Sequence, residues 1–206
     1  MKRVLFLLVC LLISSTLISL AQQQEAFKPN GKPEVRIFTN FGSTFSDGKN
    51  FNKFDVTRAY FGYIQNFSQK WSGRVTFDVG KPSVGNFHYT AFLKFAYMQY
   101  RTKKFTLNGG LISLPQYETA DRRWGFLYTY KPSHLEYGFG TAADFGVSAA
   151  YNLSDKVTMD AILVNGETFR TQETDSAFKA GFGISLYPVK NLLLRGYYDI
   201  MPKDSK

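Results

Sequence analysis

Residues of the types that perform catalysis or bind metals are scarce in this sequence. The chain of 206 residues contains two histidines, His88 and His134, and one cysteine, Cys10. Both histidines fall in expected loops, where they are explained as solvated side chains. Ser133 directly precedes His134, and adjacent residues do not form a catalytic triad unaided. No phosphate-binding loop, G-x-S-x-G or H-E-x-x-H motif occurs. We therefore predict no enzymatic activity, no metal site and no cofactor.

The basic side chains offer a different chemistry, the attraction of anions. The chain has 25 Lys and Arg against 16 Asp and Glu, a formal charge of +9. Rings of Arg and Lys are how pores favour anions. Seven basic residues lie on the polar face of expected strands or in the longest expected loop, and we predict that they line a pore: Arg58, Arg74, Arg122, Arg123, Lys131, Lys179 and Arg195. Four acidic residues share the polar faces and would neutralise part of this charge: Asp78, Asp144, Asp160 and Asp199.

The N-terminus predicts export from the cytoplasm. A short basic segment, Met1–Arg3, precedes an apolar run from Val4 to Leu20, and small residues stand at the positions expected before a cleavage site after Ala21. A retained membrane anchor is the alternative, since the run is close to the minimum spanning length. Residues 1–21 are thus a predicted signal peptide, and residues 22–34 a flexible lead-in. Export also argues against nucleic-acid binding, which the sequence pI of 9.5 would otherwise favour.

From Val35 onward the sequence alternates between apolar and polar residues, which is typical of β-strands. In the clearest segment, Trp71, Val75 and Phe77 fall on one face, and Arg74 and Thr76 on the other. Aromatic residues make up 17% of the chain, which also favours sheet over helix. Nine such segments are expected, at 35–44, 55–67, 71–80, 89–100, 105–113, 141–152, 156–165, 177–187 and 191–200.

The lengths of the connections predict what kind of sheet these segments form. Short links at 68–70, 101–104, 153–155 and 188–190 alternate with longer ones at 45–54, 81–88, 114–140 and 166–176. Transmembrane barrels have short periplasmic turns and long outer loops, and their strands need about ten residues to cross a bilayer. A soluble β-sandwich is the alternative, but it has no reason to sort its connections in this way. We predict an all-β, antiparallel, up-and-down transmembrane barrel.

Several short segments, in this order, resemble one family of outer-membrane proteins. They are residues 58–63, 78–80, 124–125, 142–147 and 165–167. Together the segments resemble the porins related to the phosphate-selective porins O and P of Gram-negative bacteria. The resemblance implies a homotrimeric, passive, often anion-preferring diffusion channel, narrowed by a long loop that folds inward. Members of that family end on a strand with a terminal aromatic residue, which the barrel-assembly machinery reads, whereas this chain ends at Lys206 without one.

These observations predict a porin in the outer membrane, surrounded by lipid, that passes small hydrophilic solutes with a weak preference for anions set by loop 114–140. The alternative is a non-conducting barrel used in adhesion or assembly. Small residues on the polar faces, such as Thr76, Ser148, Gly181 and Gly183, favour an open lumen. Nine strands are an odd number, whereas single-chain bacterial barrels have an even one. We therefore expect residues 35–206 to be the N-terminal portion of a longer barrel, an open curved sheet whose first and last strands do not pair.

Overall fold

A computed structural model describes residues 27–81, 88–171, 173–174 and 176–202. The predicted signal peptide, its cleavage site and residues 22–26 of the predicted lead-in lie outside these residues. The described part contains nine strands and two helices: β1 (Asn30–Ser46), β2 (Lys49–Asn66), β3 (Trp71–Gly80), β4 (Thr90–Arg101), β5 (Phe105–Ser113), α2 (Pro115–Trp124), α3 (Ser133–Glu136), β6 (Ala143–Ser154), β7 (Val157–Val164), β8 (Lys179–Leu186) and β9 (Leu194–Ile200).

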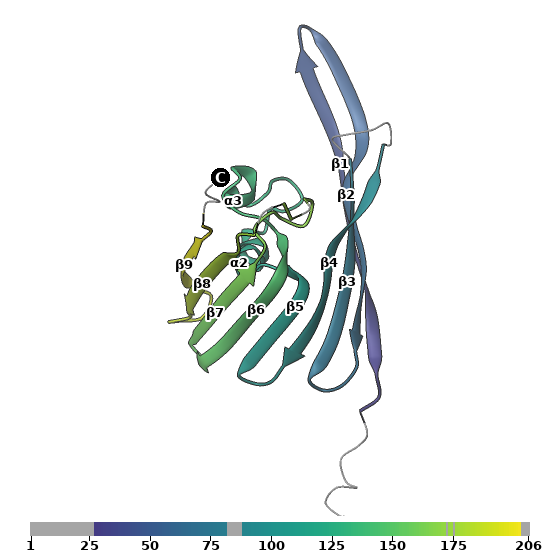
Figure 1. The fold of residues 1–206 in the computed structure, drawn as a ribbon. Coiled ribbons are helices and arrows are strands. Elements are labelled where there is room, and N and C mark those ends of the chain that lie inside the picture. Colours follow the sequence, from purple (N-terminus) through teal and green to yellow (C-terminus); the bar gives the residue numbers. More distant parts are fainter. Residues whose placement is uncertain (1–26, 82–87, 172, 175, 203–206) are drawn as a thin grey trace, which may run out of the picture.

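The strands form one antiparallel sheet in sequence order, each pairing with the next. The sheet curves strongly around the two helices (Figure 1), and no ladder joins β1 to β9 in the described residues. The prediction of an open, up-and-down sheet of nine strands, whose first and last strands do not pair with each other, is confirmed for the described residues. Among the described residues, neither helix has the length and hydropathy needed to cross a membrane.

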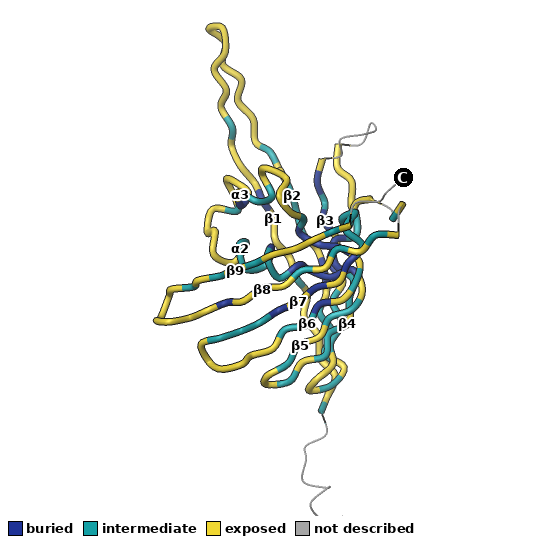
Figure 2. The backbone as a smooth tube through the Cα atoms, turned by 60° about the vertical axis from the view of Figure 1, so that its left-hand side comes forward, coloured by how far each residue is buried: buried dark blue, intermediate teal, exposed yellow. Residues whose placement is uncertain are grey.

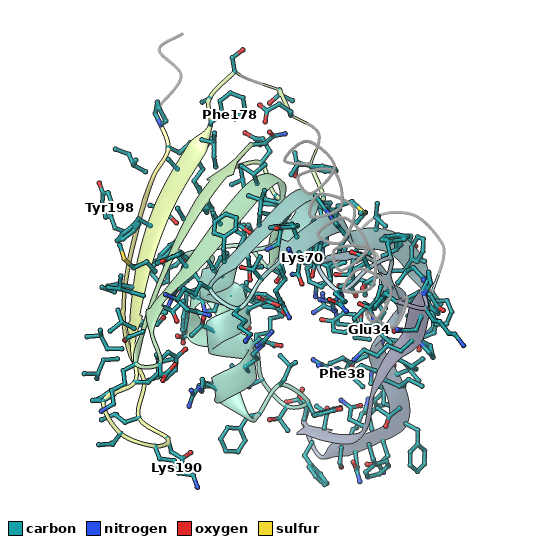
Figure 3. The ribbon with its side chains drawn as sticks, turned by 90° about the horizontal axis from the view of Figure 1, so that it is seen from below. Glu34, Phe38, Lys70, Phe178, Lys190 and Tyr198 are labelled. Atoms are coloured by element: carbon teal, nitrogen blue, oxygen red, sulfur yellow. The ribbon has the colours of Figure 1, made fainter. Side chains whose placement is uncertain are left out.

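The two faces of the sheet differ in polarity, and the polar face is the buried one. Along β3, the buried side chains of Thr76 and Asp78 alternate with the exposed side chains of Val75 and Phe77. Successive side chains of a strand point to opposite faces, so this alternation separates a polar concave face from an apolar convex face. Seen from below, Tyr198 lies on the convex side, whereas Glu34 and Phe38 lie on the concave side (Figure 3). The same apolar exposure continues around the sheet at Tyr63, Trp71, Met98, Leu107, Phe145, Val147, Tyr151, Leu163, Phe182 and Ile184.

A β-bulge in β4 explains why its sequence is apolar on both faces. The register pairs Thr76 with Phe95 but Phe77 with Leu93, so Lys94 has no partner on β3. Such an extra residue shifts the phase of the strand and re-aims its side chain. Phe92 and Phe95 therefore both face the concave side, where Lys94 and Phe95 are buried and Phe92 is half-buried.

The prediction of a long loop at residues 45–54 is wrong, because these residues belong to a long β-hairpin. β1 continues to Ser46 and β2 starts at Lys49, joined by Asp47 and Gly48 with φ of 51° and 73°. Both angles are positive, as a two-residue hairpin turn requires, and Asp-Gly is a preferred pair there. Pairing of β2 with β3 begins only at Arg58, so the hairpin projects beyond the other strands (Figure 1), and Figure 2 shows it largely exposed.

The predicted lead-in also ends earlier than expected. β1 begins at Asn30 and not at Val35, so residues 30–34 pair with β2 and do not form a flexible segment. Pro33 within this stretch obscured the strand pattern, because proline lacks the N–H group that a ladder needs. A proline is tolerated here because β1 is an edge strand, with β2 as its only neighbour in the described sheet.

The longest connection, residues 114–140, folds onto the concave face and carries both helices. α2 begins with Pro115, whose fixed φ suits a first helical position, and ends at Gly125 with φ of 71°, as helix C-caps often do. Its buried Tyr117 packs with Ile112, Leu114 and Val164 in one apolar cluster. This cluster fixes the loop against the inner surface of β5 to β7.

Candidate functional site

Helix α2 crosses the concave face and is held at both edges of the sheet. Near its start, Gln116 accepts a hydrogen bond of 2.9 Å from Arg195 Nε on β9. Near its end, Asp121 lies 3.7 Å from an Arg36 guanidinium nitrogen on β1. The helix therefore bridges the first and last strands of the described sheet and lies between a lower and an upper cavity, and a third cavity of about 440 Å³ shares lining residues with both.

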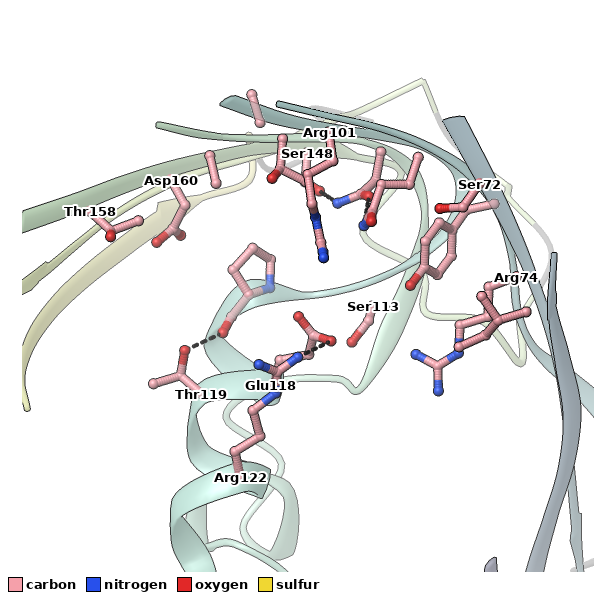
Figure 4. Close-up of a pocket in the computed structure, with 18 of the residues that line it drawn as sticks. Ser72, Arg74, Arg101, Ser113, Glu118, Thr119, Arg122, Ser148, Thr158 and Asp160 are labelled. Carbon is pink, nitrogen blue, oxygen red and sulfur yellow. Dashed lines mark hydrogen bonds and ion pairs between the residues drawn. The ribbon is translucent and has the colours of Figure 1, made fainter. Parts of the chain in front are cut away.

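The lower cavity lies between α2 and the strand ends that carry the short turns, and its volume is about 750 Å³ (Figure 4). Five basic and three acidic residues line it: Lys32, Arg74, Arg101, Arg122, Arg123, Glu34, Glu118 and Asp160. Arg122 is paired with Glu118 at 3.3 Å. Within the described part of the chain, no carboxylate lies at ion-pair distance from Arg101 or Arg123. Hydroxyl and amide groups, including Ser72, Gln99, Asn108 and Thr158, complete the lining.

The upper cavity lies on the other side of α2, toward the long connections, and its volume is about 600 Å³. Seven aromatic residues line it: Phe38, Tyr60, Phe92, Tyr117, Tyr128, Tyr130 and Phe169. Five basic residues do so as well: Arg58, Lys81, Lys94, Lys131 and Arg170. Among its described lining residues Asp78 is the only acid.

A buried charge network lines the upper cavity. Asp78 is fully buried and receives two hydrogen bonds from the Arg58 guanidinium, one of them 2.8 Å long from Nε. Lys94, whose side chain is 1% exposed, lies 3.6 Å from Asp78 and donates to the Tyr60 hydroxyl at 2.7 Å. Its ammonium group also lies 4.1 Å from the centre of the Tyr60 ring. Two basic side chains thus share one carboxylate.

Two further arginines of the predicted set make ion pairs on this face, a half-buried one at Arg74 and a buried one at Arg195. Arg74 Nε donates to Glu34 at 2.6 Å, and the same carboxylate accepts a bond from Thr76 at 3.1 Å. Arg195 donates to Asp160 at 2.6 and 2.8 Å. Asp160, one of the acidic residues predicted to compensate basic charge, therefore neutralises Arg195, and Glu34, which was not among them, neutralises Arg74.

The remaining predicted residues lie in three different places. Arg122 and Arg123, in the last turn of α2, both line the lower cavity. Lys131 lines the upper cavity and lies 3.6 Å from Glu136. Lys179 is half-buried at the start of β8 and does not line the cavities described here.

Asp144, predicted to balance basic charge, instead organises a loop. Its carboxylate accepts hydrogen bonds from the backbone N–H groups of Phe145 at 2.8 Å, Gly166 at 3.0 Å and Thr168 at 3.4 Å. These contacts fix the segment that leads to Phe169 at the upper cavity. Buried carboxylates that accept backbone N–H bonds in this way are satisfied without a cationic partner.

Each of the two histidines lies near the ring of a tyrosine. The His88 ring stacks edge-on against Tyr89, with centroids 4.4 Å apart. The His134 ring lies 6.3 Å from that of Tyr117. Burial lowers the pKa of His134, an effect that Asp121 opposes, and burial raises the pKa of Tyr117.

Sequence reasoning missed three residues of the site. Lys94 stands in an apolar run, and only the bulge reveals that it points inward. Glu34 was assigned to the lead-in, and Arg36 was not connected with Asp121 because the two lie far apart in the chain. The signal that could have found Lys94 is the charge itself, since an isolated lysine among apolar residues requires a buried partner.

No protein-family model and no curated protein sequence matches this chain.

Proposed function

We propose that this protein is an outer-membrane porin, a passive diffusion channel for small hydrophilic solutes, related to the phosphate-selective porins O and P. In this proposal the convex face contacts lipid, and the concave face lines a water-filled passage narrowed by α2. The proposed location is the Gram-negative outer membrane, reached after signal-peptide cleavage and inserted by the barrel-assembly machinery. On the basis of the same resemblance, we propose that the protein forms a homotrimer.

The observation that carries the proposal is the inverted polarity of the sheet. Phe77, Val147, Leu163 and other apolar side chains are exposed on the convex face, while Asp78, Lys94 and Asp160 are buried on the concave face. In water, each exposed Å² of apolar surface costs about 25 cal/mol, so a continuous apolar face of this kind is unfavourable. In lipid the same face is favourable, and strands of transmembrane barrels alternate in this way.

The charges on the concave face support a preference for anions. Five basic residues and one acidic residue line the upper cavity, although Lys81 and Lys131 are paired with Asp55 and Glu136 outside its lining. Five basic and three acidic residues line the lower cavity. Arg101 and Arg123 have no acidic partner among the described residues and lie where a solute would pass beside α2. Cations placed along a low-dielectric passage raise the local concentration of anions. We propose small anions, phosphate-like ions among them, as preferred solutes.

The test is the conductance of the protein extracted from outer membranes and inserted into planar lipid bilayers. We expect stepwise ohmic channels, and in a potassium chloride gradient a reversal potential displaced toward that of chloride. A reversal potential displaced toward potassium would contradict the anion preference. Protein that is folded by circular dichroism but gives no conductance steps would contradict the channel itself.

One observation favours the alternative of an adhesive, non-conducting barrel. The projecting end of the β1–β2 hairpin, which does not pair with β3, presents exposed aromatic side chains, with Phe45 at 76% and Phe54 at 87% exposure. Deleting residues 42–53 separates the two functions. A porin would keep its conductance after the deletion, whereas an adhesin would lose binding to its target surface.

A further inference from the structure

The upper cavity contains paired aromatic rings with cations placed over them. The rings of Phe92 and Phe169 lie 6.0 Å apart at an interplanar angle of 37°. The Arg170 guanidinium lies 4.6 Å from the centre of the Phe92 ring and 5.2 Å from that of Phe169. No ion pair of Arg170 is found within the described residues. The Arg170 side chain is exposed and lines the cavity, so a ligand that approaches these rings can meet its guanidinium.

A second cluster of aromatic side chains comes from β1, β2 and the long connection. Phe38 contacts Tyr60 edge-on at 5.5 Å and the Tyr128 ring of the long connection at 4.8 Å. The Arg58 guanidinium lies 5.1 Å from the centre of the Tyr60 ring. Both groups line the same cavity, and Tyr128 is 61% exposed, so its ring is accessible.

The two cavities therefore differ in the ligands that they suit. The hydroxyls, amides and partly paired charges of the lower cavity suit small hydrated solutes, and among its described lining residues only Tyr97 and Tyr187 are aromatic. The upper cavity combines aromatic faces with an excess of cations. Aromatic rings stack on flat apolar groups, and arginine binds carboxylates while it stacks on rings. A volume of about 600 Å³ also falls in the range of small-molecule sites.

We propose that the upper cavity binds organic anions with a flat apolar body, the class of aromatic carboxylates, in preference to inorganic phosphate. This inference rests on the proposed function for its biological meaning, since it names the solutes that the channel would collect. Inorganic phosphate has no apolar surface, so it gains nothing from the seven aromatic side chains. An aromatic carboxylate uses both features of the cavity, the rings and the cations.

The test measures binding directly and needs no conductance. The protein is reconstituted in lipid vesicles, and binding of 2-naphthoate is followed by equilibrium dialysis, with empty vesicles to subtract partitioning into lipid. We expect saturable binding that Arg170→Gln weakens about tenfold, which corresponds to about 1.4 kcal/mol. Tyr128→Leu, which removes an exposed ring, should weaken it severalfold. Neither side chain is buried, so both variants keep the fold.

The matched control is Arg101→Gln, which removes one exposed cation from the lower cavity. It should leave naphthoate binding unchanged, and inorganic phosphate should compete with naphthoate only at a concentration at least tenfold higher. Equal competition by phosphate, or equal losses in the Arg170 and Arg101 variants, would overturn the inference while leaving the porin proposal intact. Saturable, Arg170-dependent binding by a protein without conductance would support the inference and refute the porin.

Discussion

Replacing Arg195 with leucine should destabilise the protein more than any exposed charge substitution. Arg195, 8% exposed, lies on β9 and joins four elements of the fold. It donates to Asp160 on β7, to Ser185 on β8 at 2.8 Å and to Gln116 on α2 at 2.9 Å. Arg195→Leu fills much of the same volume but leaves Asp160, which is 6% exposed, without its cation.

The expected magnitude follows from the burial of both partners. Removing one member of a buried ion pair leaves an uncompensated charge and costs about 3–5 kcal/mol. Replacing both members with apolar residues is often close to neutral. The double variant Arg195→Leu/Asp160→Leu should therefore be more stable than Arg195→Leu alone by about 2 kcal/mol or more. The exposed pair of Arg122 with Glu118 gives the control, since Arg122 is 75% exposed. Arg122→Leu should change the free energy of unfolding by less than about 1 kcal/mol.

The assay is urea unfolding of the refolded protein in lipid vesicles, followed by circular dichroism and by the shift in gel mobility that folded barrels show. The midpoint for Arg195→Leu should fall well below that of the control, and the double variant should lie between them or above the control. A loss equal to that of Arg122→Leu would refute the reasoning, since it would mean that Arg195 is solvated. A double variant no more stable than Arg195→Leu would also refute it.

Four further predictions concern single features of the chain. Replacing both Arg122 and Arg123 with alanine should lower the anion-to-cation permeability ratio, measured from the reversal potential in a salt gradient; an unchanged ratio would exclude loop 114–140 as the selectivity element. Gly146→Ala should lower stability by about 2 kcal/mol or more, measured by urea unfolding, because φ is +153° and a Cβ would collide with the β7 backbone. Since burial lowers the pKa of His134, stability of loop 114–140 should be complete above pH 6.5 and decline as the pH falls below that value. Faster proteolysis of this loop at acidic pH, abolished by His134→Gln, would support this, and a pH-independent rate would contradict it. N-terminal sequencing of the exported protein should begin at the residue after Ala21, and recovery of Met1 would refute cleavage.

The sequence predicted the number, order and faces of the strands because alternation is a local signal that a half-buried strand must carry. It failed at 45–54, where both faces of the β1–β2 hairpin are exposed, so no face is selected for apolar residues. The alternation also gives no single phase for β4, because the bulge at Lys94 changes which residues share a face. Both failures arise where the two-residue period is absent or interrupted.

The site was predictable only in part, for a related reason. Arg58, Arg74 and Arg195 fall on the polar phase of their strands, and all three lie on the concave face. Their partners could not be foreseen in detail, since Glu34 is 40 residues from Arg74 and Gln116 is 79 residues from Arg195. Such contacts depend on the curvature of the sheet and on the path of α2, which no local pattern encodes.

We propose that the concave face contacts water and the convex face contacts lipid. Cysteine labelling tests this proposal most directly. The chain has one cysteine, Cys10, within the predicted signal peptide, so single cysteines can be introduced on an otherwise thiol-free mature protein. Gln99→Cys and Thr106→Cys place thiols in the lower cavity, and their neighbours Met98→Cys and Leu107→Cys place them on the convex face. In intact outer membranes, a hydrophilic maleimide should label the first two and spare the second two. Equal labelling of all four positions, or labelling of the convex pair alone, would contradict the account.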